Sequence, residues 1–212
     1  MLAVDRCCVF RWRVGWCGIH GLGGGRQSGQ VTVSELIIAC VRTGEHIPFD
    51  CVMVLRNAVA RHLARAHTVV CLTDQPERCS GVAFVDISAM DLAGQWARFA
   101  LFEPQWRAGA KVIHLSFDVV VVGDLTALAD IPGEFAICRS EAPSRSRYDS
   151  SVMVLGALMG NFIWNGFERR RGLLMHTHGR SADKAIEELY PSAPFLKPQL
   201  PEGFFKHHLR LM

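Results

Sequence analysis

Residues 111–125 constrain the fold of this chain more than any other stretch, because two apolar runs flank a short polar break. Residues 112–115 are typical of a buried strand, and residues 119–122 form a second run made entirely of valine. Ser116 and Asp118 lie between the two runs. An ionised carboxylate is costly to bury without a partner, so Asp118 is expected at a strand end rather than inside the core.

Ser116 and Asp118 are predicted to face one cleft together. Side chains two positions apart on an extended segment point the same way. Open α/β sheets bind ligands beyond the carboxyl ends of their strands, so this pair is a candidate site. The alternative is that Asp118 only caps the strand end or pairs with a cation there.

The rest of the sequence alternates apolar strand patterns with amphipathic helix patterns. Such alternation favours a Rossmann-like α/β fold with a mostly parallel central sheet and a mixed C-terminal part. His176 and His178 are compatible with one strand face, as metal ligands would be, or with an unrelated surface pair. Strands are predicted at residues 36–41, 68–72, 82–85, 111–116, 135–138 and 151–155, and helices at 49–66, 94–102, 161–171 and 183–189.

Charge and length limit the classes of function. The chain has 212 residues and a net charge of +3, and it suits a single domain spanning residues 31–212. Four arginines against one aspartate place that whole charge in residues 1–30, so the remainder is neutral. A neutral domain lacks the basic face that follows a phosphate backbone, and no nucleic-acid partner is expected.

Residues 1–30 differ from the domain and are interpreted as a disordered N-terminal extension. They are rich in glycine and interrupted by arginine, which is not typical of a secretory signal. No apolar stretch is long enough for a transmembrane helix. The eight cysteines include no C-x-x-C pair. Reduced thiols without a secretory signal favour a cytoplasmic location.

Five motifs in the same order resemble GT-A-type glycosyltransferases, specifically the bacterial family-eight-like group. The strand at 111–125 is similar to that family's metal-binding strand, in which an Asp-x-Asp pair stands where this chain has Ser116-Phe-Asp118, a degenerate form of the motif. The likeness spans about residues 34 to 210. The other four motifs are Val70-Cys-Leu-Thr-Asp74, Gln95-Trp-Ala-Arg-Phe-Ala-Leu-Phe102, Asp149-Ser-Ser-Val-Met153 and Lys206-His-His-Leu-Arg210.

The resemblance implies a retaining transferase that moves a sugar from a nucleotide-diphosphate donor of the UDP type to an acceptor hydroxyl. Mn²⁺ or Mg²⁺ would neutralise the leaving diphosphate, with Asp118 as its ligand. Arg42 and Asp74, both at strand ends, are interpreted as contacts to the base or ribose, and Asp149 and Asp183 as the sugar side. The implied donor-binding positions are Arg42, Asp74, Arg98, Ser116, Asp118, Asp149, Asp183 and Lys206.

Departures from the family pattern leave two hypotheses open. Ser116 is a neutral, weak ligand where the family has a carboxylate. The sequence also stops at Met212, before the family's final His-Gly-x-Pro-Lys-Pro segment, which supplies a metal-binding histidine. The first hypothesis is an active transferase, for which no catalytic residue is identified and the acceptor is unknown. The second is an inactive, truncated relative that keeps the fold and at most weak nucleotide binding. Outside the family, a more distant third hypothesis is an unrelated α/β nucleotide-binding protein.

Overall fold

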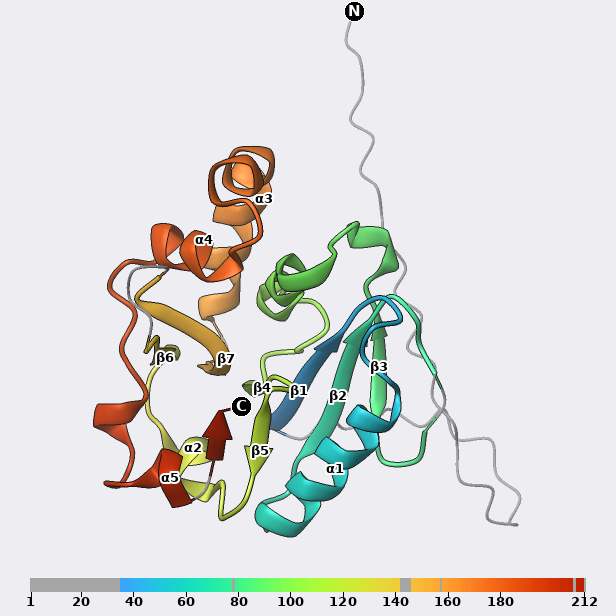
Figure 1. The fold of residues 1–212 in the computed structure, drawn as a ribbon, viewed down its shortest axis with the longest axis vertical. Helices are drawn as coiled ribbons and strands as arrows, with labels where there is room; N and C mark the ends of the chain where they lie inside the picture. Colours follow the sequence, from blue (N-terminus) through green and yellow to red (C-terminus); the bar gives the residue numbers. More distant parts are fainter. Residues whose placement is uncertain (1–34, 78, 142–145, 157, 208, 212) are drawn as a thin grey trace, which may run out of the picture.

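The computed structural model describes residues 35–77, 79–141, 146–156, 158–207 and 209–211, which form a six-stranded sheet with helices on both faces (Figure 1). The extension expected at residues 1–30 lies outside this described part. The strand order is β3-β2-β1-β4-β7-β6. The strands are β1 (Leu36–Arg42), β2 (Thr68–Thr73), β3 (Ala83–Asp86), β4 (Lys111–Leu115), β6 (Phe135–Arg139) and β7 (Tyr148–Leu155).

Four neighbouring strands, β3, β2, β1 and β4, run parallel, and β7 runs antiparallel to β4 on one side and to β6 on the other. The mostly parallel sheet with a mixed C-terminal part is therefore confirmed. Because β7 is reversed, its first residues meet the carboxyl ends of the parallel strands at one edge of the sheet. A separate ribbon pairs β5 (Val119–Val121) with β8 (Leu209–Leu211).

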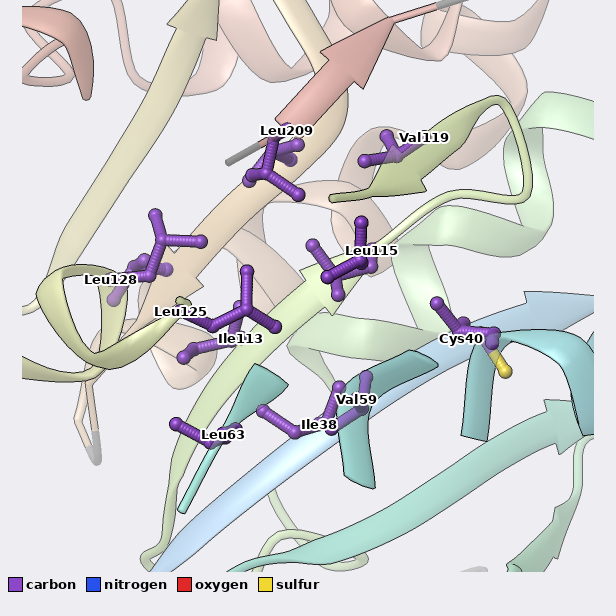
Figure 2. Close-up of a cluster of buried hydrophobic side chains, with 14 of the residues drawn as sticks. Ile38, Cys40, Val59, Leu63, Ile113, Leu115, Val119, Leu125, Leu128 and Leu209 are labelled. Carbon is purple, nitrogen blue, oxygen red and sulfur yellow. The ribbon is translucent and has the colours of Figure 1, made fainter. Parts of the chain in front are cut away.

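The sheet separates two apolar layers, because successive side chains along each strand point to opposite faces. On β1, Ile38 and Cys40 point to one side, while Ile37 and Ala39 point to the other. The first layer, drawn in Figure 2, packs β1 and β4 against α1 and the β5–β8 ribbon. The second packs against η2, α3 and α4. The helices are α1 (Asp50–His62), η1 (Ser88–Met90), η2 (Gly94–Phe102), α2 (Thr126–Asp130), α3 (Met159–His178), α4 (Ala182–Leu189), η3 (Lys197–Gln199) and α5 (Phe204–His207).

Several local predictions need correction. The helix predicted at 49–66 ends at His62, because Leu63 adopts an extended backbone with φ −137° and ψ 99°. The helix predicted at 161–171 continues to His178, so His176 and His178 lie on α3 and share no strand face. The pattern at 94–102 is helical as predicted, but it forms a 3-10 helix. Cys40, Cys71 and Cys138 are buried free thiols.

Gly156 joins β7 to α3 at a point where the chain passes very close to Glu134. A Cβ atom at Gly156 would lie 2.6 Å from Glu134 Oε2 and 2.8 Å from its Cα. The same carboxylate accepts a hydrogen bond from Leu158 N at 2.7 Å, at the start of α3. The carbonyl of Gly156 accepts from the buried Arg107 guanidinium at 3.0 Å. This junction therefore fixes where α3 begins.

Gly156→Ala should destabilise the protein by about 1–3 kcal/mol, because the new methyl group meets backbone as well as side chain at Glu134. Gly172→Ala on α3 is the matched control, since nothing lies within 4 Å of its added Cβ and alanine favours helix. Urea denaturation of both variants measures the difference. Equal free energies of unfolding for the two would contradict the tight approach at Gly156.

Candidate functional site

Seven of the eight predicted site residues lie at, or contact, the edge where β1, β2 and β4 end and β7 begins; Lys206 is the exception. The β4–β7 register pairs Leu115 with Val152. One step further, Ser116 N donates to Ser151 O at 2.8 Å. Ser116 is thus held by the ladder although β4 has ended. We call this region the carboxyl edge.

Ser116 and Asp118 lie side by side at this edge. Ser116 Oγ donates to Asp118 Oδ2 at 3.4 Å, which is a long contact. Asp118 is exposed and Ser116 is half-buried. The carboxylate therefore stays hydrated and able to accept a ligand, whereas the core begins immediately beside it at Leu115 and Val119.

An irregularity in β7 brings a second carboxylate to the same edge. The β6–β7 register moves from Ile137 opposite Met153 to Cys138 opposite Asp149, which leaves extra β7 residues in between. Such bulges redirect side chains at functional edges. Asp149 Oδ1 accepts from the backbone N of Ser151 at 2.9 Å and from its Oγ at 2.6 Å. Asp149 is thereby oriented by the residue that also accepts from Ser116 N.

Arg98 and Asp183 form a half-buried network around Ser150. Arg98 Nη1 donates to Ser150 Oγ at 2.7 Å and lies 3.8 Å from Asp183 Oδ1. Asp183 accepts from both the backbone N and the hydroxyl of Ser150. Burial raises the pKa of Asp183, while Ser150 and Arg98 act in the opposite direction. This network ties η2 and α4 to the start of β7.

His114 lies under this network on β4. Its Nδ1 is 3.1 Å from Ala39 O, and since a carbonyl can only accept, that nitrogen carries the proton. Nε2 is then an acceptor, and it is buried without a hydrogen-bond partner among the described residues. Burial, helped by the charge of Arg98, lowers the pKa of His114 to about 3. His114 is therefore neutral near pH 7.

Arg42 and Asp74 both shape the loop that follows β1. Arg42 Nε donates to Ile47 O at 2.8 Å, and its Nη1 lies 3.2 Å from Glu77 Oε1. Both Asp74 oxygens accept from Gly44 N, at 3.1 and 3.0 Å. Gly44 has a φ of +69°, a backbone conformation that favours glycine. These two predicted contacts are thus occupied in holding a loop beside the carboxyl edge.

The donor contact expected of Lys206 cannot be followed to its side chain, and the hollow described below is not at the predicted positions. The backbone of Lys206 lies in α5, close to the ribbon that follows Asp118, but its side chain lies outside the described part. A hollow of about 480 Å³ lies between α4, the end of α3 and the segment before β7, with Arg147 and Lys184 in its wall. None of the eight predicted positions lines it.

Ser150, Ser151 and His114 belong to the site although they are not among the eight predicted donor-binding positions. A signal was present in the serine pair that directly precedes the apolar run of β7, because two hydroxyls at a strand end can orient neighbouring carboxylates. His114 carried no such signal, since a single histidine within an apolar run is equally compatible with the core.

The described residues fit a cation only in part. No group of three or more His, Cys, Asp or Glu side chains is placed to hold a metal ion in the part of the chain that the structure describes. Mg²⁺, however, commonly uses one or two carboxylates together with waters and substrate phosphates. Asp118 with Ser116 fits such a site, in which the ion arrives with a diphosphate.

The sequence matches no protein-family model and no curated protein. Solved structures do match its fold. The bifunctional glycosyltransferase WbbM has a TM-score of 0.56 at 16% identity, covering 80% of this chain and 40% of that chain. The galactosyltransferase LgtC, solved with donor and acceptor sugar analogues, has 0.53 at 10%, covering 81% and 82%. GlyE from Streptococcus pneumoniae has 0.52 at 16%, covering 76% and 44%.

These similarities establish the fold, which is that of the GT-A glycosyltransferases. The chain spans less than half the length of GlyE and of WbbM. No described helix combines the length and the apolar character that crossing a membrane requires.

His114 should make the protein less stable in acid. A histidine in the unfolded chain titrates near about pH 6.5, whereas burial holds the folded pKa at about 3. Between these values the unfolded chain binds a proton that the folded chain does not, so the free energy of unfolding falls as the pH falls. The limit is about 1.4 kcal/mol per pH unit.

His114→Gln should flatten that pH dependence, measured by urea denaturation across this window. His176→Gln is the matched control, because His176 is exposed on α3 in the folded protein and loses little water contact on folding. An unchanged slope in the His114 variant would show that another group causes the acid sensitivity.

Proposed function

We propose that this protein is a glycosyltransferase that moves a sugar from a UDP-type donor to an acceptor hydroxyl. The observation that carries the proposal is the exposed Asp118 beside Ser116 at the carboxyl edge of a GT-A fold. Open α/β sheets bind ligands at this edge. In the transfer, the bond between the anomeric carbon and the diphosphate oxygen breaks and its electron pair stays with UDP. The acceptor oxygen forms the new bond and loses its proton.

Asp118 would hold the cation that accompanies the donor, with Ser116 as a neutral neighbour. Mn²⁺ or Mg²⁺ bound there would neutralise charge on the diphosphate. Because Ser116 adds no charge beside Asp118, the affinity of the protein alone for the ion should be low. The ion is therefore proposed as part of the donor complex rather than as a resident cofactor.

The remaining predicted positions divide between the two ends of the donor. Arg42 and Asp74 would position the loop that follows β1, and this loop would contact the base and ribose. Asp149 and Asp183 would accept hydrogen bonds from the sugar hydroxyls, with Arg98 orienting Asp183. Lys206 is proposed as a donor contact on the resemblance alone. No residue is assigned as catalytic.

The alternative is an inactive relative that binds a nucleotide weakly. The observation in its favour is Ser116 itself, because a hydroxyl replaces a carboxylate at the first position of the pair. Loss of an outer-shell partner of a metal ligand already costs about 10- to 100-fold in affinity or activity. The two alternatives differ in whether the protein turns over a sugar donor.

Calorimetric titration with UDP should show tighter binding with Mn²⁺ than without it. Asp118→Asn should remove this dependence and weaken binding by about tenfold or more, since it removes the charge that holds the ion. Asp91→Asn is the control, because Asp91 is exposed and its φ of 50° suits asparagine. Release of sugar from the UDP-sugar distinguishes the transferase from the inactive relative. UDP binding that is unchanged both by Mn²⁺ and by Asp118→Asn contradicts the proposed site.

Ser116→Asp should tighten Mn²⁺ binding in the presence of UDP, by about 10-fold or more, because it restores a second carboxylate beside Asp118. Ser151→Asp is not an equivalent change, since Ser151 orients Asp149. Titration of Mn²⁺ into the UDP complex measures the gain. If Ser116→Asp has no effect, the missing carboxylate does not limit ion binding.

A further inference from the structure

The outward side of α3 carries an unusual group of exposed apolar side chains. Leu158 at its start and Phe162 and Leu173 along it are 71%, 61% and 59% exposed. They are three of the six large apolar side chains that are exposed in the described part of the chain. Scattered exposed apolar residues are ordinary, but a group on one element indicates an interaction surface.

Helical spacing places these residues on one stripe. At 100° per residue, positions 158, 162, 169, 173 and 176 fall within about 60° of one another. We call Leu158, Phe162, Arg169, Leu173 and His176 the outer stripe of α3. The opposite side of the helix buries Ile163, Phe167 and Leu174 in the core. The helix is therefore apolar on two sides. The core covers one of them, while on the other Phe162 meets the ring of Tyr190 only edge-on and remains 61% exposed.

The stripe has an excess of positive charge. Arg169 lies between Phe162 and Leu173, and no acidic residue belongs to the stripe. Beyond the end of α3, Arg180 and Lys184 are also exposed. Of the nearby acids, Glu188 is paired with Arg170 and His178, and the exposed Glu168 lies on another side of α3, about 80° from the stripe. Figure 1 shows α3 at the rim of the molecule, extending away from the sheet.

We propose that the outer stripe of α3 binds an anionic membrane surface. The stripe lies on a single convex helix and its apolar side chains are spaced along about 22 Å. A fluid lipid interface accommodates such spacing, because each apolar side chain inserts separately while an arginine between them reaches the headgroup phosphates. The charge of Arg169 complements anionic headgroups. This surface is separate from the carboxyl edge and does not depend on the proposed transferase activity.

Vesicle flotation of the full chain tests the proposal. The protein should float with phosphatidylcholine vesicles that contain phosphatidylglycerol, and much less with phosphatidylcholine alone. A double variant, Phe162→Ser with Leu173→Ser, should weaken binding by about tenfold or more. Arg169→Gln should weaken it by about fivefold. Val54→Ser is the matched control, because Val54 is 65% exposed on α1; it should change binding by less than about twofold.

Three outcomes would overturn the proposal. The first is that the wild-type chain does not float with anionic vesicles. The second is that the double variant floats as well as the wild type, which would assign binding to another part of the chain. The third is a dimer in light scattering that the double variant abolishes, in the absence of vesicle binding, which would make the stripe an interface between copies. Thermal melting confirms that each variant is folded.

Discussion

The hydrogen bond from Ser116 N to Ser151 O holds together the two halves of the carboxyl edge. β4 brings Ser116 and Asp118 to this edge from one direction, and the reversed β7 brings Asp149, Ser150 and Ser151 from the other. Without this hydrogen bond, which lies one residue beyond the Leu115–Val152 pair, the polar residues that follow β4 would not be fixed to a neighbouring strand. The reversed strand therefore turns the ordinary end of a parallel sheet into a site with side chains from two chain segments.

Hydrogen bonds among half-buried polar groups hold the region behind this edge together. Asp183 and Arg98 are largely removed from water, and an unpaired charge in such a place would be costly. Each is instead bonded to Ser150, so the bulge of β7 cannot shift without breaking contacts to both η2 and α4. Among the residues that the structure describes, the exposed Asp118 has only the long contact with Ser116, which leaves its carboxylate available for exchangeable ligands.

Most of the fold, but only part of the site, could be predicted from the sequence. The apolar runs of β1, β2 and β4 predicted their strands closely, because they are short and rich in β-branched residues, which favours a buried strand over a helix. The end of α1 and the extent of α3 were missed, because they depend on the backbone of Leu63 and on contacts such as Trp96 Nε1 to Gly179 O. Ser116 and Asp118 could be placed by their position after β4. The pairing of Arg98 with Ser150 and Asp183 could not, because three distant segments form it.

The close approach at Gly156 has a consequence for how sequences of this fold can diverge. A side chain at that position would meet the backbone of Glu134, so trimming Glu134 alone cannot make room for it. A descendant that loses the glycine has to reroute the segment before β6 at the same time, which requires several changes together. Glycine at position 156 should for that reason persist while the side chain at position 134 is free to change.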